Sequence, residues 1–436
     1  MTSEHKPGWL QEAEQTLIRY CGEFSESLII RAKGAYVYTA DGREILDFTS
    51  GQMCTIFGHN HPDIVTAITA GAGSSIHLLS AMLSPPVLEL SKALAEILPP
   101  ELSKSLLMST GSESNEVAIR MAKLVTGGFE VIGFTGSWHG MTAGAQSHTY
   151  SLTRKGYGPV MPGSYAIPSP NCYRCPIQHC ENRCDTTCLE VGMALVDAQS
   201  LGAYAAVIVE PILSAAGIIE LSADYLQKLQ MMCSDRGLLL IFDEAQTGLG
   251  RLGDRFGFEQ SGVVPDMLTL SKTLGGGLPL SATITSDEIE EECYRRGFIS
   301  VTSHVSDPLP ARVGLAVLSI LLRERMEARA KEMGNYLKKQ LIEIMNRYDC
   351  VGDVRGRGLL LGMEIVTDKI SKTPAPALGA LISNRCLRNG LSMNIVRVKG
   401  YGGVFRIAPP LTITREEIDL GVAILDTSIK EVLAER

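Results

Sequence analysis

A lysine and an aspartate stand at the ends of two apolar runs and could together perform carbonyl chemistry. Lys272 follows residues 267–270 and precedes the glycine-rich stretch TLGGGLPL, and Asp243 follows residues 238–242. A buried lysine amine with a depressed pKa can form a covalent bond to a carbonyl carbon. A nearby carboxylate can hold a protonated aromatic nitrogen through a charge-assisted hydrogen bond of about 1.5–3 kcal/mol. Each residue alone could equally be an ion-pair partner or a helix cap.

Five short apolar runs end in polar or reactive residues, which predicts how the chain positions this pair. The runs are residues 105–109, 131–134, 205–209, 238–242 and 267–270, and they lead into Thr110-Gly111-Ser112, Trp138, Glu210, Asp243 and Lys272. Runs of this kind followed by turns and helical patterns are typical of βαβ units around a mainly parallel sheet. Ligands of open α/β sheets bind at the carboxyl ends of the strands. We therefore expect one site where these loops converge.

The C-terminal third has a different pattern. A long amphipathic helix is expected over residues 311–348, followed by a shorter α+β mixture with a strand at residues 404–408. The last helix is expected to begin after Thr414, because Glu417 completes a capping box. We predict an N-terminal arm (residues 1–55) that joins a small C-terminal domain (residues 316–436), and a large α/β domain between them (residues 56–315).

Composition excludes several classes of protein. Among 436 residues, 45% are hydrophobic and 20% are charged, which is typical of a globular chain and excludes a disordered or collagen-like one. The net charge of −8 provides no general basic field for nucleic acid. The most apolar stretch, residues 201–219, contains Glu210 and Pro211, and the N-terminus lacks a secretory h-region. We therefore expect a cytoplasmic protein that binds neither nucleic acid nor membranes.

Five of the eleven cysteines gather in one insertion, residues 172–188. They are Cys172, Cys175, Cys180, Cys184 and Cys188. Thiolates at this spacing could surround a zinc ion. The segment could instead form a redox-sensitive disulfide, or be a surface insertion with reduced thiols. The spacing leaves all three interpretations open.

Motifs spread over nearly the whole chain resemble those of class III, fold type I pyridoxal-phosphate (PLP) enzymes related to ω-aminotransferases. The motifs are GHNHP at residues 58–62, STGSESNEVAIR at 109–120, SWHGMT at 137–142, FDEAQTGLGR at 242–251, LSKTLGGGLPL at 270–280 and RGRGLLLGMEI at 355–365. Four others are similar to those of the 2,2-dialkylglycine decarboxylases: GQM at 51–53, SHVSDPLPA at 303–311, GLSMNIV at 390–396 and GGVFRIAPPLT at 402–412. The resemblance implies a large domain with a mainly parallel sheet flanked by helices, and a smaller α+β domain.

The resemblance also implies roles for residues around the coenzyme. Lys272 would bond to PLP, Asp243 would pair with its ring nitrogen, and Trp138 would stack on its ring. Gln246 would contact the ring hydroxyl. The phosphate would be held by Thr110, Gly111 and Ser112, and by Ser303 from the other subunit of a homodimer, or of a dimer of dimers.

For the substrate, the resemblance implies that Arg406 binds the α-carboxylate. Many ω-aminotransferases have a glutamate that covers this arginine, whereas this chain has Ala215 there, which favours α-amino acids. Gln52, followed by Met53, would hold the carboxylate in position for decarboxylation, with Lys272 returning a proton. Ala215 and Val301 replace larger or more polar residues of the decarboxylases, so the pocket is expected to be wider and more apolar.

The implied reaction is decarboxylation-coupled transamination. A 2,2-dialkylglycine would yield a ketone and carbon dioxide, with a 2-oxo acid such as pyruvate as amino acceptor. An α-amino acid aminotransferase or epimerase on the same fold is the alternative. A metal- or redox-sensing interaction protein organised by the five cysteines is a more distant one.

The resemblance further implies alkali-metal sites. The expected potassium ligands are Leu78, Ser80, Ser303, Val305 and Asp307. A sodium site near Ala95, Leu98, Pro99 and Leu102 is less favoured, because Leu98 replaces a threonine and supplies no hydroxyl.

Overall fold

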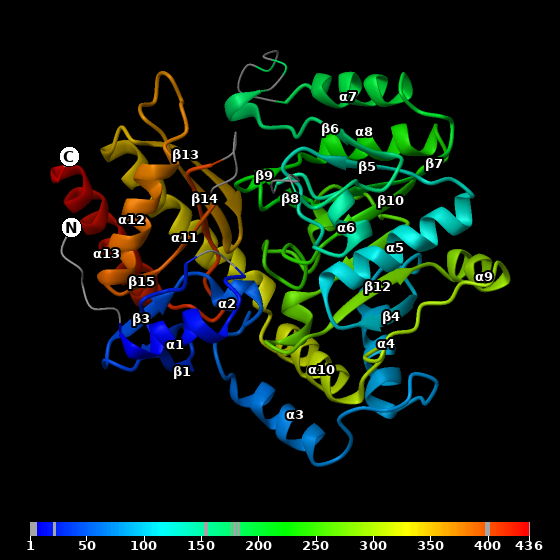
Figure 1. Cartoon of the computed structure of the whole chain (residues 1–436), viewed down its shortest axis with the longest axis horizontal. Helices are drawn as coiled ribbons and strands as arrows, with labels where there is room; N and C mark the ends of the chain where they lie inside the picture. Colours follow the sequence, from blue (N-terminus) through cyan, green and yellow to red (C-terminus); the bar gives the residue numbers. More distant parts are fainter. Residues whose placement is uncertain are drawn as a thin grey trace.

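The computed structural model describes residues 7–20, 23–151, 156–175, 177, 180, 184–396 and 402–435. Figure 1 shows a broad sheet with its helices on one side of the molecule. Two smaller sheets lie on the other side with three C-terminal helices, α11 (Met326–Arg347), α12 (Pro376–Arg388) and α13 (Arg415–Ala434).

The broad sheet has seven strands in the order β4-β12-β11-β10-β7-β5-β6. These strands are β4 (Lys104–Met108), β5 (Glu130–Phe134), β6 (Ser164–Ile167), β7 (Tyr204–Val209), β10 (Leu239–Asp243), β11 (Met267–Leu270) and β12 (Ser281–Thr285). Strand β12 is antiparallel to both neighbours, and the other neighbouring pairs are parallel. The predicted α/β fold with a mainly parallel sheet is confirmed, and each of the five predicted runs matches a strand to within one residue at either end.

Both faces of this sheet are covered by helices. Side chains of successive residues in a strand point to opposite faces. Accordingly, Ile241 of β10 packs in the cluster that contains Val117 of α5 (Gly111–Thr126), whereas Phe242 packs in the cluster that contains Leu229 of α8 (Ala223–Ser234). Burial on both faces explains why the central strands β7, β10 and β11 are nearly continuous apolar runs.

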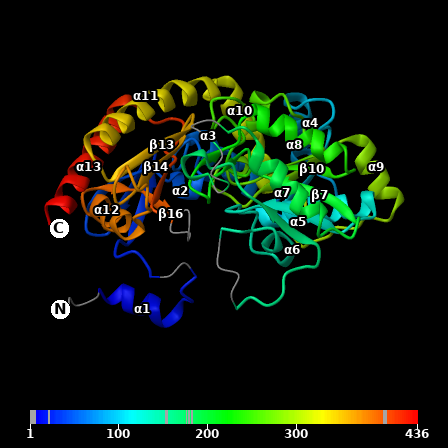
Figure 2. The same ribbon diagram turned by 90° about the horizontal axis from the view of Figure 1, so that it is seen from above.

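Other helices connect or flank the sheets. They are α1 (Gly8–Thr16), α2 (Ser50–Met53), α3 (Pro62–Ala72), α4 (Pro85–Ile97), α6 (Ala143–Ser147), α7 (Thr187–Asp197), α9 (Asp287–Arg295) and α10 (Pro308–Arg323), with the 3₁₀ turns η1 (Cys172–Arg174), η2 (Gly257–Gln260) and η3 (Lys272–Gly275). Figure 2 shows α1 standing apart from the sheets. Across the described residues, no helix has the length and apolar character needed to cross a bilayer.

The smaller sheets combine both ends of the chain. One is antiparallel, with the order β13 (Val351–Arg357), β14 (Leu360–Ile365), β17 (Val404–Ile407) and β16 (Asn394–Val396). The other joins β1 (Ile29–Lys33), β2 (Tyr36–Thr39) and β3 (Glu44–Asp47) to β15 (Leu391–Ser392), which runs parallel to β3. A two-stranded ribbon is formed by β8 (Ile212–Leu213) and β9 (Ile219–Glu220).

The single long helix predicted over residues 311–348 is wrong. The structure has two helices there, α10 and α11, because Arg325 adopts a left-handed backbone conformation with φ of 48°. A left-handed residue cannot continue a right-handed helix, so the axis breaks although the apolar periodicity continues. The predicted domain boundary between residues 315 and 316 falls inside α10.

Candidate active site

The loops after β4, β5, β10 and β11 converge on a cavity of about 380 Å³. Among its lining residues are six of the predicted coenzyme residues: Thr110, Gly111, Ser112, Trp138, Asp243 and Lys272. The parallel sheet brings them together because its strands end at one edge. Cys54, from the N-terminal part of the chain, also lines the cavity.

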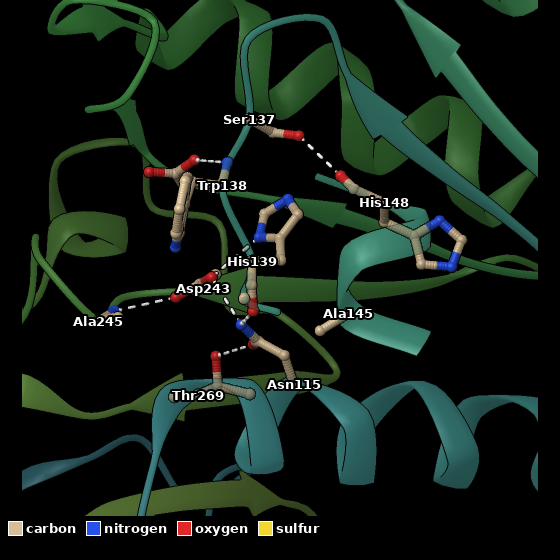
Figure 3. A network of polar contacts seen from close by, with 12 residues as sticks. Asn115, Ser137, Trp138, His139, Ala145, His148, Asp243, Ala245 and Thr269 are labelled. Atoms are coloured by element: carbon tan, nitrogen blue, oxygen red, sulfur yellow. Dashed lines mark hydrogen bonds and ion pairs between the residues drawn. The ribbon is translucent and has the colours of Figure 1, made fainter. Parts of the chain in front are cut away.

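Asp243 is held by three hydrogen bonds at the end of β10 (Figure 3). Its Oδ2 atom lies 2.8 Å from Nδ2 of Asn115 and 2.8 Å from Nδ1 of His139. Its Oδ1 atom accepts from the backbone N–H of Ala245 at 3.1 Å. Asn115 is oriented in turn, because its Oδ1 accepts from the Thr269 hydroxyl at 2.6 Å. The carboxylate is therefore fixed before any ligand arrives.

The electrostatics favour an ionised Asp243 and a weakly basic Lys272. Burial opposes ionisation of Asp243, but the hydrogen bond and charge of His139, the charge of Lys272 and the N–H of Ala245 together outweigh it, so the pKa of Asp243 is below its usual value. Burial lowers the pKa of Lys272, although Asp243 acts in the opposite direction. Lys272 also has a left-handed backbone with φ of 40°, a strained conformation that is concentrated at functional sites.

Trp138 is positioned by a buried glutamate. Its backbone N–H donates to Oε1 of Glu210 at 2.9 Å, and the N–H of Ser214 donates to Oε2 at 3.2 Å. Burial raises the pKa of Glu210 to about 7, against the effect of His139. Glu210 thus ties the loop after β5 to the loop after β7.

The part of the cavity lined by Thr110, Gly111 and Ser112 fits a small anion. Thr110 caps α5 in a capping box with Glu113, so the helix N-terminus faces the cavity. A Cβ atom on Gly111 would lie 2.7 Å from the Ser271 hydroxyl, and one on Gly140 would overlap Ser112. Glycine at both positions keeps this cradle open for a phosphate group.

Arg406, the predicted carboxylate-binding residue, lies on β17. Its strand partner in β16 is Asn394, whose Nδ2 donates to Oε1 of Gln52 at 3.4 Å. Burial lowers the pKa of Arg406, and Glu210 raises it. Among the described residues, Nε of Arg406 is buried without a hydrogen-bond partner. An unpaired buried guanidinium nitrogen is costly and suits a bound carboxylate.

The segment that carries Gln52 is unusual. Residues 50–53 all have positive φ values, between 47° and 64°. The Ser50 hydroxyl donates to the carbonyl of Ala408 at 2.6 Å, which ties this segment to the end of β17. Gln52 itself is exposed, whereas Met53 is buried with Ile212 and Ile218, outside the cavity lining.

Other predicted site residues are not in the cavity lining. Val301 and Ser303 are exposed, and Ala215 is buried beside the β8–β9 ribbon. Gln246 is buried, and among the described residues its Oε1 has no hydrogen-bond partner. The geometry of one chain thus leaves the roles of Val301 and Ser303 as predictions.

The predicted potassium residues come from two adjacent loops. The Ser80 hydroxyl donates to the carbonyl of Thr302 at 3.2 Å. Asp307 is already engaged, because Oδ1 lies 2.6 Å from Nδ1 of His77 and Oδ2 lies 2.7 Å from Nδ1 of His304. Each carboxylate oxygen keeps a further lone pair, so the role of Asp307 as a potassium ligand stays a prediction. For the sodium site, Leu98 is buried at the end of α4, and its side chain offers no oxygen.

Sequence reasoning assigned no role to the residues that orient the predicted ones, although Glu210 was among the strand-end residues expected at the site. Asn115, His139, Glu210 and Thr269 hold Asp243 and Trp138 in place. The first two lie in the motifs that carried the resemblance, three residues after Ser112 and one after Trp138. Proximity to a motif was therefore the available signal, but it says nothing of which atoms pair.

The donor set matches the groups of PLP. The cavity has a fixed carboxylate for a ring nitrogen, an amine for an aldehyde, an indole beside them and an anion cradle at a helix N-terminus. Among the described residues, Nε2 of His139 and Oε1 of Gln246 are buried without hydrogen-bond partners. The residues present fit the coenzyme that the sequence predicts.

Comparisons with known proteins agree with this geometry. The model of the family Aminotransferase class-III matches residues 22–429. An uncharacterized aminotransferase of Schizosaccharomyces pombe is 48% identical over 419 residues, covering 96% of this chain and 94% of that protein. A leucine/methionine racemase of Thermococcus litoralis is 33% identical over 418 residues, covering 94% and 92%. The crystal structure of a Bacillus anthracis aminotransferase superposes with a TM-score of 0.92 at 29% identity, covering 99% of this chain and 100% of that one.

Proposed function

Because this chain belongs to the class III aminotransferase family, we propose that it is a PLP enzyme that moves the amino group of an α-amino acid to a 2-oxo acid. The observation that carries this proposal is the pairing of His139 with Asp243 beside Lys272, with the half-buried Arg406 nearby. The first three residues serve the coenzyme, and the arginine serves the substrate.

The coenzyme, when bound, withdraws electrons from the bonds at the substrate Cα. Lys272 would hold it covalently, Asp243 would keep its ring nitrogen protonated, and Trp138 would cover its ring. The phosphate would lie on the backbone of Thr110, Gly111 and Ser112. The strained Lys272 is anchored between β11 and the glycine-rich turn, so its amine stays at the cavity wall.

Lys272 would move the proton. Burial lowers the pKa of its amine, so a larger share of it is neutral near pH 7 and able to accept a proton from Cα. The same Nζ atom would then return the proton, either to the opposite face of Cα or to another atom of the reacting groups. General acid–base transfer of this kind contributes about 10²–10⁴-fold in rate.

Arg406 would select substrates that have an α-carboxylate. Its planar guanidinium can make a bidentate pair with a carboxylate. Many ω-aminotransferases have a glutamate that covers the corresponding arginine, and this chain has Ala215 at that position. No acidic side chain from that position therefore competes for Arg406. This supports α-amino acids as amino donors.

Decarboxylation of α,α-disubstituted glycines is the second candidate. It is favoured by the chain of contacts from Gln52 through Asn394 to the strand of Arg406. The α2 segment also packs against η3, which begins at Lys272. A carboxamide at this place would turn the substrate carboxylate out of the coenzyme plane, which favours loss of carbon dioxide over loss of the Cα proton.

One set of assays separates the candidates. The purified enzyme would be given 2-aminoisobutyrate with pyruvate, and L-alanine with 2-oxobutyrate. Release of carbon dioxide and acetone in the first mixture would establish decarboxylation, and conversion only in the second would leave transamination. Solvent deuterium at Cα without amino transfer would indicate racemisation, the activity for which the Thermococcus relative is named. No reaction with PLP-loaded enzyme in any mixture would remove the proposal.

The variant Gln52→Ala tests the second candidate. We expect carbon dioxide release from 2-aminoisobutyrate to fall at least about tenfold, the effect of losing roughly 1.4 kcal/mol of transition-state contact. Transamination of L-alanine should change little. The variant Gln340→Ala, at a half-buried glutamine whose side chain contacts Asp419, is a matched control. Equal loss of both reactions would mean that Gln52 supports the structure of the site and does not select decarboxylation.

We propose a homodimer in which Ser303 and Val301 complete the site of the partner subunit. Both are exposed in the single chain, which supports this arrangement. Analytical ultracentrifugation of the holoenzyme tests whether it is a dimer. Mixing Ser303→Ala subunits with Lys272→Ala subunits tests whether Ser303 completes the site of the partner subunit. Potassium dependence and a cytoplasmic location stay predictions.

A further inference from the structure

The sulfur atoms of the cysteine-rich segment converge on one point. The Sγ atoms of Cys172, Cys180 and Cys184 all lie within 4.8 Å of one another. The Sγ atom of Cys175 lies 3.6 Å from that of Cys180. All four residues are reduced cysteines, partly shielded from solvent. Three sulfurs therefore face one another at distances that metal ligands can have, and the sulfur of Cys175 lies beside one of them.

These separations fit a tetrahedral metal better than a disulfide. A disulfide needs sulfur atoms about 2.05 Å apart. Zinc–sulfur bonds of about 2.3 Å in a tetrahedron place neighbouring sulfurs about 3.8 Å apart. The 3.6 Å between Cys175 and Cys180 is close to that value. The three clustered sulfurs thus lie near the spacing of a thiolate cage, which Cys175 would complete from its place beside Cys180.

The surroundings supply the hydrogen bonds and rigidity that such a cage requires. The backbone N–H of Thr186 donates to Sγ of Cys184 at 3.4 Å. Cys188 stands in the first turn of α7 and is buried, so α7 anchors the C-terminal end of the segment. Cys172 begins η1, which Asn171 caps by accepting from the N–H of Arg174 at 3.3 Å. Hydrogen bonds from the surroundings to ligands are a usual part of metal sites.

We propose that Cys172, Cys175, Cys180 and Cys184 bind one Zn²⁺ ion as a structural tetrathiolate site. Cys188 stays outside the coordination shell as a buried thiol that donates to Cys184. The site is closed, with four protein ligands and no open position, so the ion stabilises structure and takes no part in the reaction. This inference is independent of the proposed function, because none of its ligands lines the active-site cavity.

The ion would fix a contact between the two parts of the molecule. Between Cys172 and Cys175, the Arg174 guanidinium forms an ion pair with the buried Glu364 of β14 and donates to the carbonyl of Lys372 at 2.8 Å. The Tyr173 ring lies 4.7 Å from Nζ of Lys372. A metal ion that anchors η1 would therefore hold the cysteine-rich segment against the C-terminal sheet that contains β14.

Metal analysis of the holoenzyme tests the inference. Protein produced in zinc-supplemented medium and passed over a chelating resin should retain about one zinc ion per chain. Replacement by Co²⁺ should give thiolate charge-transfer and tetrahedral d–d bands, the latter at wavelengths where PLP does not absorb. The inference is overturned if the wild type contains no zinc and shows no cobalt bands after replacement. Iron in place of zinc would also overturn it and would indicate an iron–sulfur cluster instead.

Variants assign the ligands. Cys180→Ser and Cys184→Ser should each lose most of the zinc, whereas Cys188→Ser and the control Cys293→Ser, on α9, should retain it. Retention of zinc by Cys184→Ser would overturn the site. Loss of zinc in Cys188→Ser together with retention in Cys175→Ser would overturn the assigned fourth ligand. The wild-type measurements keep the test decisive if a variant fails to fold.

Discussion

Nδ1 of His139 lies 2.8 Å from Oδ2 of Asp243, and both side chains are buried. This pair fixes the carboxylate that would meet the coenzyme ring, so the histidine acts as a positioning residue. Its effect should appear in how strongly and in which protonation state PLP is held.

The variant His139→Leu should weaken PLP binding by about tenfold or more, because a buried hydrogen bond to a charged group contributes about 1.5–3 kcal/mol. Titration of the apoenzyme with PLP, followed by absorbance, measures this. The absorbance should also show a shift in the pH at which the bound chromophore changes colour, which a merely structural role would not move. The control His61→Gln alters the N-cap of α3 and should leave both values unchanged.

The variant Lys272→Ala should lose covalent attachment of PLP. Borohydride treatment followed by denaturation and mass spectrometry should label the wild type on this residue and leave the variant unlabelled. Turnover should fall by about 10²-fold or more, since the proton-transferring amine is gone. Lys104→Ala, which removes a surface ion pair with Asp287, serves as the control. Labelling elsewhere in the wild type would disprove the assignment.

The variant Arg406→Gln should discriminate between substrate types. With α-amino acids, kcat/KM should fall by about 30-fold or more, because loss of a charged hydrogen bond costs about 2 kcal/mol. With a simple amine that has no carboxylate, the rate should change little. Steady-state kinetics with both substrates gives the comparison. Equal losses for both would mean that Arg406 supports the fold and does not bind the carboxylate.

Glu244 should make stability depend on pH. Burial raises the pKa of this fully buried carboxyl to about 7, so the folded state binds its proton more tightly than the unfolded state does. The free energy of unfolding should therefore decrease as pH rises from about 4.5 to about 7, by about 3 kcal/mol from this group. Urea unfolding of Glu244→Gln should show a shallower decrease across this range. Exposed Glu96→Gln should follow the wild type.

Strand ends were the predictable part of the site. Asp243 and Lys272 follow apolar runs long enough to identify as strands, and parallel strands end at one edge of a sheet. Trp138 and the phosphate loop were found in the same way. The pairing of Asn115 with Asp243 was not predictable, because it depends on where a helix face lies relative to a strand end.

Features that depend on backbone conformation also escaped prediction. No glycine or proline stands next to Arg325 to mark the break, so the apolar periodicity predicted one helix. Likewise, the left-handed run at residues 50–53 leaves Gln52 exposed while Met53 is buried. Such conformations are imposed by tertiary packing, which outweighs local preference.

The parallel pairing of β15 with β3 has a consequence for biosynthesis. Residues 44–47 leave the ribosome long before residues 391–392, so the edge of β3 stays uncovered until most of the polypeptide has been translated. An uncovered strand edge is a template for association with other chains. Truncated or stalled nascent products should therefore aggregate through this edge.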